Sequence, residues 1–215
     1  MNKTVRLPRE PVPGPARPGL ESLGSRIRAA REAKGVSLRE FARVLGLSPS
    51  LISQIERGRV MPSVGTLYAI SNELELTFDD VFSSNEQPAA SSPGAGPAAR
   101  TGGPVQRAHD RKRIRLAGGV RWERLTPGHD EQLEFVYVVY PVGAASCPED
   151  ALFRHPGREY AYVLSGRLGV RIGFEEYELG PGDSLAFSSQ IPHRLWTIGD
   201  EPVTAVWAIL NRGSG

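Results

Sequence analysis

The spacing of the hydrophobic residues changes once along this chain, from a helical pattern to a strand-like one. Between the two lies a stretch that has neither pattern. Residues 83–104 read SSNEQPAASSPGAGPAARTGGP and have no apolar periodicity. Before this stretch apolar residues recur at helical spacing, and after it they form short runs typical of strands. We therefore predict a helical domain at 20–82 and a β domain at 105–215, joined by a linker at 83–104. Five prolines within residues 8–19 predict a disordered arm at 1–19.

The helical domain is predicted to contain five helices, because start and stop signals recur along it. The predicted starts are Ser37 with Glu40, Ser48-Pro49, Pro62-Ser63 and Thr77 with Asp80. Gly35, Gly46 and Gly58 stand where helices should end. The first helix should be apolar along one face, through Leu23 and Ile27.

The β domain is predicted to be an antiparallel barrel or jelly roll. Its runs are VRWERL, LEFVYVVY, EYAYVLSG, LGVRIG, EYELG, SLAFS, HRLWTI and VTAVWAIL. They are short, rich in Val and aromatic residues, separated by Gly, Pro or Asp, and without helical patterns between them. The predicted fold class is therefore an α + β two-domain protein, with a five-helix domain followed by an antiparallel β-barrel.

The second and third predicted helices have the spacing of a helix-turn-helix. Ala42 is small where the third helix crosses it, Gly46 supplies the positive φ of the turn, and Ile52 lies between the helices. The segment SLREFARVLGLSPSLISQIERGRVMPSVGTLYAISNELEL resembles the XRE (Cro/C1-repressor-like) family over residues 20–82. This resemblance implies a dimer that places its third helix in the major groove of DNA.

The polar face of the third helix is expected to read the bases. Gln54 can bridge two polar atoms of an adenine edge, and the short Ser50 and Ser53 side chains allow close approach. The resemblance places Pro49 at a base-facing position as well, where the family commonly has a polar residue. The predicted phosphate contacts are four arginines: Arg39, Arg43, Arg57 and Arg59.

Charge supports a DNA interaction of modest strength. The chain carries +2 overall, but residues 1–82 carry +3 and residues 105–215 carry −1. Binding should therefore depend strongly on salt and on dimerisation. In the resembling family Glu56 pairs with an arginine of the first helix, here Arg31, which makes Glu56 structural.

The barrel carries two motifs that resemble those of the cupin fold, over residues 107–211. The family's first motif normally begins His-x-His, whereas this chain has Phe153-x-His155, then Glu159 and Gly166. In the second motif Pro181-Gly182-Asp183 precedes Pro192-His193. The resemblance implies a double-stranded β-helix in which His155, Glu159 and His193 retain three of four metal-ligand positions, while Phe153 cannot coordinate.

Two histidines and one carboxylate leave open positions on a metal. Either a divalent ion (Fe, Mn, Ni or Zn) binds there, or the histidines hydrogen-bond within a polar pocket that holds an organic effector. The predicted pocket residues are Phe153, Tyr160, Tyr162, Arg171 and Trp196. Arg154, Arg158, Arg171 and Arg194 lie near the motifs, and an anionic effector is one interpretation.

The leading hypothesis is a transcriptional regulator, not an enzyme: a homodimer that binds an operator and senses a small molecule or metal in its barrel. We expect coupling through the relative placement of the barrels in the dimer, because the linker transmits torque poorly. The runner-up is a non-haem Fe(II) cupin oxygenase, resembling an epoxidase of phosphonate antibiotic biosynthesis, and a third hypothesis makes the barrel a dimerisation block. The single cysteine, Cys147, and the absence of a long apolar run predict a cytoplasmic protein without disulfides or membrane spans.

Overall fold

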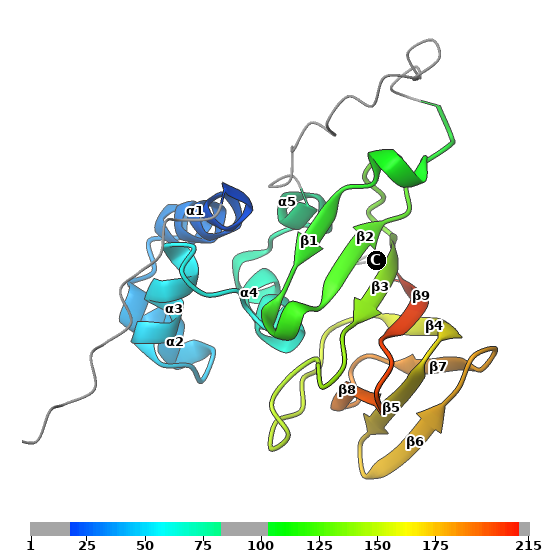
Figure 1. Cartoon of the computed structure of the whole chain (residues 1–215). Helices are drawn as coiled ribbons and strands as arrows, with labels where there is room; N and C mark the ends of the chain where they lie inside the picture. The colour runs from blue at the N-terminus through cyan, green and yellow to red at the C-terminus, as the bar shows by residue number, and fades with distance from the viewer. Residues whose placement is uncertain (1–17, 83–102, 211–215) are drawn as a thin grey trace, which may run out of the picture.

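The computed structural model describes residues 18–82 and 103–210 of the chain (Figure 1). Most of the predicted arm at 1–19 and of the predicted linker at 83–104 lies outside these residues. The first helix begins at Pro18, two residues before the predicted domain boundary. No helix among the described residues combines the length and the apolar character that crossing a membrane requires.

Five helices form the N-terminal domain, as the start and stop signals predicted. They are α1 (Pro18–Ala33), α2 (Leu38–Val44), α3 (Pro49–Glu56), α4 (Val64–Leu74) and α5 (Phe78–Phe82). The side chains of Ser37, Ser48 and Ser63 accept hydrogen bonds from the first turns of α2, α3 and α4. These bonds satisfy N–H groups that the helices themselves leave without partners.

Two glycines allow the helix-turn-helix to close. Gly46 has a φ of 66° in the turn between α2 and α3, a conformation that side chains other than glycine rarely adopt. At Gly24 a Cβ atom would lie 2.4 Å from the carbonyl oxygen of Ile55, so α1 crosses α3 with no room for a side chain. Ala42 and Ile52 are fully buried between the helices, as predicted.

The C-terminal domain is built from two antiparallel sheets. Its strands are β1 (Arg113–Arg115), β2 (Arg121–Arg124), β3 (Leu133–Tyr140), β4 (Arg158–Ser165), β5 (Arg167–Ile172), β6 (Glu175–Leu179), β7 (Ser184–Ser188), β8 (His193–Ile198) and β9 (Val203–Leu210). The first sheet has the order β1-β2-β3-β9-β4-β7, and the second has the order β6-β5-β8. The eight predicted runs all form strands, whereas β1 was not predicted, because three residues are too few for an alternating pattern.

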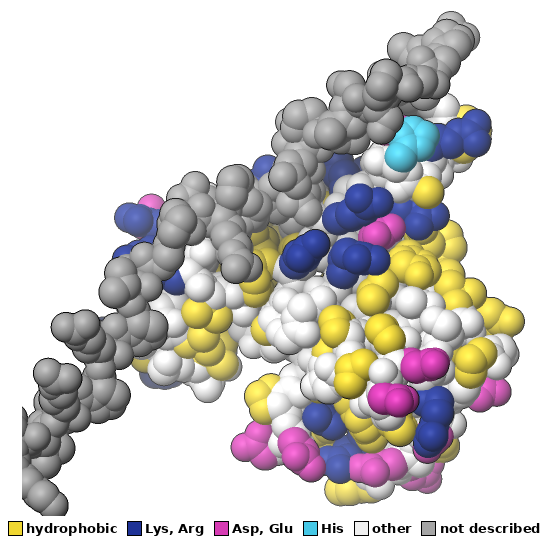
Figure 2. Space-filling model, in the orientation of Figure 1, with side chains coloured by type: hydrophobic (Ala, Val, Ile, Leu, Met, Phe, Trp, Pro, Cys, Tyr) yellow, Lys and Arg dark blue, Asp and Glu magenta, His cyan; other side chains and the backbone are white. Residues whose placement is uncertain are grey.

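The basic segment that contains β1 forms the edge of the first sheet, where β1 pairs with β2. Arg111, Arg113 and Arg121 place guanidinium nitrogens 3.2–3.3 Å from the carboxylate of Glu123. Figure 2 shows the Lys and Arg side chains gathered over β1 and β2. These arginines surround a buried carboxylate, so three of the basic residues around the first strand have a structural partner.

The two domains are in direct contact. The N–H of Gly65 donates to the carbonyl of Ser146 at 3.0 Å, and the N–H of Ala117 donates to the carbonyl of Pro62 at 2.9 Å. Helices α4 and α5 lie between α1–α3 and the barrel (Figure 1). The buried apolar residues of both domains form one continuous core. The two domains are therefore in contact beyond the predicted linker, because the start of α4 is fixed to the barrel by backbone hydrogen bonds.

Candidate functional site

The face of α3 that was predicted to read DNA has an exposed Ser50 and half-buried Ser53 and Gln54, and its side chains are hydrogen-bonded to one another. Gln54 Nε2 donates to Ser50 Oγ at 3.4 Å, and Arg57 Nη1 donates to Ser53 Oγ at 2.6 Å. Both pairs are four residues apart, which places them along one side of the helix. Ile52 and Ile55 are buried on the opposite side. The polar face therefore lies away from the core.

The predicted phosphate contacts are all exposed side chains: Arg39, Arg43, Arg57 and Arg59. Pro49, the first residue of α3, is exposed as well. By contrast, Arg31 is buried and donates to Glu56 from both Nε, at 2.6 Å, and Nη2, at 3.0 Å. The predicted pairing of Glu56 with Arg31 is confirmed, so Glu56 braces α1 against α3.

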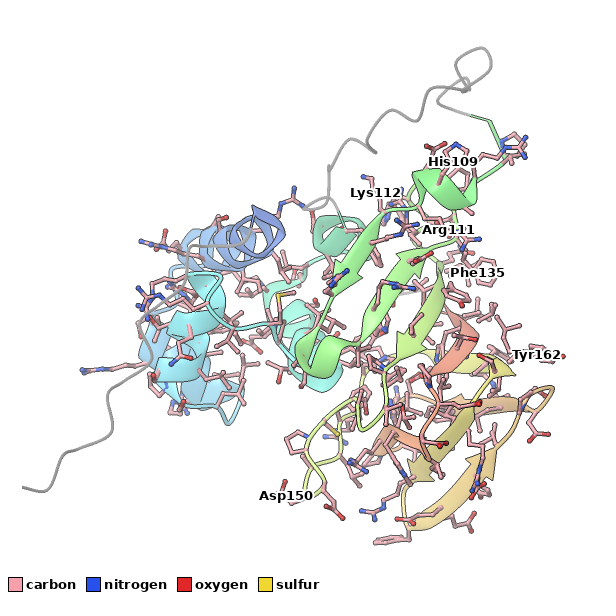
Figure 3. All side chains as sticks on the ribbon, viewed as in Figure 1. His109, Arg111, Lys112, Phe135, Asp150 and Tyr162 are labelled. Carbon is pink, nitrogen blue, oxygen red and sulfur yellow. The ribbon has the colours of Figure 1, made fainter. Side chains whose placement is uncertain are left out.

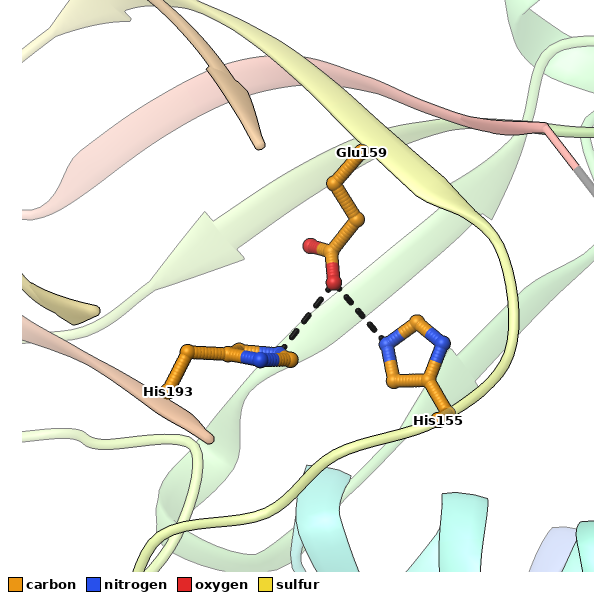
Figure 4. Close-up of side chains that lie close together, drawn as sticks. All are labelled: His155, Glu159 and His193. Carbon is orange, nitrogen blue, oxygen red and sulfur yellow. Dashed lines mark ion pairs between the residues drawn. The ribbon is translucent and has the colours of Figure 1, made fainter. Parts of the chain in front are cut away.

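The barrel brings the three predicted metal-ligand residues together. His155 precedes β4, Glu159 lies in β4, and His193 begins β8 in the opposite sheet (Figure 4). All three are buried, and their ligand atoms lie within 4.8 Å of one another. The backbone of Phe153 pairs with that of His193 through two hydrogen bonds, of 3.1 and 2.9 Å, which fixes the loop carrying His155 beside β8.

The donor set fits a divalent cation. His155 Nε2 lies 2.9 Å and His193 Nε2 lies 3.2 Å from Glu159 Oε1 (Figure 4). Ligand atoms about 2.1 Å from a common ion are separated by roughly 3.0–3.4 Å, so these spacings match a coordination sphere. These three buried atoms also have no hydrogen-bond partner among the described residues. Buried polar atoms without partners are costly, and an ion would compensate for that cost.

The other atoms of these side chains orient the ligands. His155 Nδ1 lies 3.0 Å from the carbonyl oxygen of Pro156, and His193 Nδ1 lies 2.9 Å from that of Ile191. A carbonyl only accepts, so Nδ1 must carry the proton in each ring, which leaves the Nε2 lone pair for a metal in the neutral ring. Such outer hydrogen bonds commonly fix ligand histidines.

Glu159 is held in its charged form. Burial opposes the charge, but the imidazoles of His155 and His193 beside its carboxylate outweigh burial and lower the pKa of Glu159 to about 2. Trp207 Nε1 donates to Glu159 Oε2 at 2.7 Å, which leaves Oε1 directed at the histidines. Sequence reasoning did not identify this contact, because a strand pattern does not reveal which cross-strand neighbour an indole meets.

A residue of the helical domain completes the surroundings of the site. The ring of Tyr68, from α4, stacks on that of His155 with centroids 3.9 Å apart and an interplanar angle of 4°. The Tyr68 hydroxyl donates to Glu134 Oε2 at 3.1 Å. No sequence signal identified Tyr68, since it sits at a helical position that ordinary core packing would also explain.

Of the five predicted pocket residues, only Phe153 lies beside the metal-ligand residues, with its ring centroid 4.2 Å from that of His193. The prediction was wrong for the other four, because strand alternation turns them outward. Tyr160 and Tyr162 are exposed on β4, at 39% and 49%. Arg171 pairs with Glu176 on the surface, and Trp196 covers Gly169, where a Cβ would lie 2.1 Å from the indole.

The room for a ligand lies between the domains. A cavity of about 290 Å³ opens between α4, α5 and the barrel and reaches His155. Inside the barrel, beside Glu159, the cavity is only about 20 Å³. None of the arginines proposed to attract an anion lines either cavity, and Arg194 instead lies over Trp196. The carboxylates of Asp130, Glu131 and Glu134 line the larger one, so its charge disfavours an anion.

Comparison with known families identifies both domains. Residues 27–81 match a helix-turn-helix family, and residues 136–209 match the cupin domain family. Among solved structures, the chain resembles an HTH_3 family transcriptional regulator from Vibrio cholerae, with a TM-score of 0.61 and 22% identity, covering 90% of this chain and 97% of that one.

Two relatives that align with this chain over most of their own length are named as HTH-type transcriptional regulators. The HTH-type transcriptional regulator PuuR of Escherichia coli is 27% identical over 172 residues, which is 79% of this chain and 84% of PuuR. The HTH-type transcriptional regulator SutR of the same organism is 24% identical over 181 residues, 84% of this chain and 90% of SutR. The chain therefore has an N-terminal helix-turn-helix domain of the XRE type and a C-terminal cupin domain, and over most of its length it is similar to proteins named as HTH-type transcriptional regulators.

Proposed function

We propose that this regulator binds operator DNA as a dimer through α3, and that occupancy of its barrel site sets its affinity for DNA. The observation that carries the proposal is the row of polar side chains, Ser50, Ser53, Gln54 and Arg57, along the outward side of a capped α3 whose other side is buried. Base edges in the major groove are read by such short polar side chains and amides. A protein that reads chromosomal DNA works where that DNA is, so a cytoplasmic location is part of the proposal.

The barrel site is proposed to hold one divalent first-row metal through His155, Glu159 and His193. Two imidazoles and a carboxylate suit Fe, Mn, Ni or Zn, and open coordination positions would accept a further ligand. The convergence of three buried acceptor atoms without hydrogen-bond partners among the described residues supports this assignment.

The test of DNA recognition is selection from a pool of randomised duplexes with the full chain, in buffers with and without added metal. We expect enrichment of a sequence with two related half-sites whose centres lie about one helical turn, or a multiple of it, apart. A Gln54→Ala variant should recover a different or relaxed base preference, and an Arg57→Ala variant the same preference with weaker binding. Failure of the full chain to enrich any sequence would exclude the proposed DNA reading.

The outer face of the six-stranded sheet is proposed as the surface that a second copy of this chain covers. Phe135, Tyr137, Tyr160, Tyr162 and Val206 lie in adjacent rows of β3, β9 and β4 on this face. Figure 3 shows Phe135 and Tyr162 projecting from the barrel, and apolar side chains are visible there in Figure 2. One eight-residue recognition helix reads only a half-site of an operator. An operator with two half-sites therefore needs two recognition helices, and a second copy of the chain supplies the other one.

Sedimentation of the full chain tests this surface. We expect a dimer for the native chain and a monomer for Tyr162→Glu, because a buried carboxylate facing its own symmetry mate is unfavourable. Phe174→Ser, at the fully exposed tip between β5 and β6, is the control and should remain dimeric. A dimer that survives Tyr162→Glu unchanged would place the interface elsewhere.

The donor set also favours a second candidate function, that of an Fe(II)-dependent oxygenase. Bound Fe(II) in a site of two histidines and one carboxylate would supply dioxygen chemistry at its open positions. Two features weigh against this function: the ordered DNA-reading face of α3, which an enzyme does not need, and the small cavity beside Glu159. Oxygen uptake by the Fe(II)-loaded chain with candidate substrates would favour the enzyme, and its absence would favour the regulator.

A further inference from the structure

Both imidazoles of the barrel site are covered by rings that connect them to the DNA-binding domain. Tyr68, a residue of α4, lies flat against His155, with centroids 3.9 Å apart. Phe153 lies against His193, with centroids 4.2 Å apart, and is also stacked with Tyr68 at 6.0 Å. Ribbons of the helical domain, in cyan, are visible below His155 in the close-up of Figure 4. His155 therefore contacts the helical domain directly through Tyr68, and His193 is connected to it through Phe153.

Phe153 occupies this place because α4 makes room for it. A Cβ atom built on Gly65 would lie 3.0 Å from both Cβ and Cγ of Phe153, so the helix backbone rests directly on this side chain. The backbone of Phe153 is fixed to His193 by two hydrogen bonds. The position at which the cupin motif normally has a ligand thus carries a contact between the domains.

The start of α4 is the segment through which such a contact can reach the DNA-reading helix. It follows α3 after seven residues, 57–63, and its neighbours Pro62 and Gly65 are the residues hydrogen-bonded to barrel loops. Val64 and Leu67 are buried in the core that also contains Ile52 and Ile55 of α3. The start of α4 is thus connected to the barrel by backbone hydrogen bonds and belongs to the same apolar core as the buried side of α3.

The space available to a ligand points to the same boundary. The cavity of about 20 Å³ beside Glu159 holds about one water molecule, whereas the cavity of about 290 Å³ is walled by α4 and α5 on one side and the barrel on the other. Its polar lining is rich in acceptors, including Asp130, Glu131 and Glu134, and contains no Lys or Arg among the described residues. It fits a small organic molecule that carries hydrogen-bond donors and no negative charge.

We infer that the barrel site is shared by the two domains, with Tyr68 as a wall residue contributed by the DNA-binding domain, so that occupancy of the site and affinity for DNA are thermodynamically linked. The inference rests on the proposed function, since it needs both metal binding and DNA binding. Linkage requires that the factor by which metal changes DNA affinity equals the factor by which DNA changes metal affinity. Because this equality holds for any two coupled sites, agreement of the two factors shows that the coupling is measured at equilibrium, and the loss of coupling in a Tyr68 variant tests whether the wall between the domains carries it.

The experiment uses the full chain, Co²⁺ as a spectroscopic probe, and the duplex obtained by selection. Fluorescence anisotropy gives the Kd for the duplex with and without saturating Co²⁺, and visible absorption gives the Kd for Co²⁺ with and without saturating duplex. For the native chain we expect both ratios to differ from one by about 5-fold or more, and to agree with each other. Tyr68→Leu, which keeps apolar bulk in α4 but removes the ring, should bring both ratios below about 2-fold.

Tyr177→Ala is the matched control, because Tyr177 is an exposed tyrosine of β6 outside the site, and it should behave as the native chain. If Tyr68→Leu fails to fold by circular dichroism, Gly65→Ala serves instead, since its added methyl displaces Phe153 and should also change the coupling. Binding of both Co²⁺ and duplex without coupling, or coupling unchanged in both variants, would overturn the shared site alone. A native chain that binds no Co²⁺ would overturn the proposed metal site and the shared site together.

Discussion

The indole of Trp207 offers the sharpest test of how the barrel site is built. Trp207 Nε1 donates to Glu159 Oε2 at 2.7 Å, and both side chains are buried. Trp207→Phe keeps an aromatic ring but leaves a charged, buried oxygen without this donor. The hydrogen bond to a charged group contributes about 1.5–3 kcal/mol, so we expect the free energy of unfolding to fall by about that amount. Removal of a partner that orients a metal ligand typically lowers metal affinity about 10–100-fold, and we expect the same for Co²⁺.

Urea unfolding followed by circular dichroism gives the stability, and Co²⁺ titration by visible absorption gives the affinity. Trp196→Phe is the control, since it is the same substitution on the outer side of β8, where the indole makes no hydrogen bond to Glu159. The control should leave Co²⁺ affinity unchanged. The reasoning would be refuted if Trp207→Phe and Trp196→Phe had the same Co²⁺ affinity and unfolding free energies within about 0.5 kcal/mol of each other.

Three further outcomes follow from the structure. Arg57→Ala should weaken binding to all duplexes alike and reduce the slope of log K against log salt concentration by about 0.9. Gln54→Ala should change the base preference without changing that slope. Salt titrations of DNA binding by both variants check this. Gly24→Ala should destabilise the chain by about 1–3 kcal/mol in urea unfolding, because its methyl group meets the backbone of α3, and an unchanged midpoint would contradict the packing described. Burial raises the pKa of the Cys147 thiol, so less thiolate is present at pH 8 than in a free cysteine. Iodoacetamide should therefore alkylate the native chain more slowly than the urea-unfolded chain. The difference between the two rates should narrow as the pH rises through the raised pKa.

The helical domain could be predicted closely because its signals are local. Ser48 caps α3, and Gly46 takes the positive φ of the turn; each acts within four residues of its own position. The strands were predicted almost as well, since alternation along a strand assigns its inner and outer faces. Only β1, three residues long, has too few positions to display a period. Local signals of this kind require no knowledge of which elements meet.

Contacts between elements could not be predicted in the same way. The motifs identified His155, Glu159 and His193, and the sheet pairing then brought them together. Trp207 and Tyr68 complete the site from β9 and α4, and nothing in their own segments distinguishes them from ordinary core residues. The incorrect pocket residues have a related cause: nearness to a motif in sequence was used where strand alternation decides which side chains enter the barrel.

Phe153 shows how a departure from a motif can carry information that the motif itself does not. Considered alone, a phenylalanine at a ligand position indicates only a weakened metal site, because three ligands remain where the family has four. In the structure its ring contacts His193 on one side and the backbone of Gly65 on the other. A Cβ at position 65 would lie 3.0 Å from Phe153, closer than ordinary contact, so a side chain there would require Phe153 to shift. The substitution that removed a ligand therefore also supplied a contact with the DNA-binding domain, and a regulator needs such a contact if its barrel is to influence how α3 meets DNA.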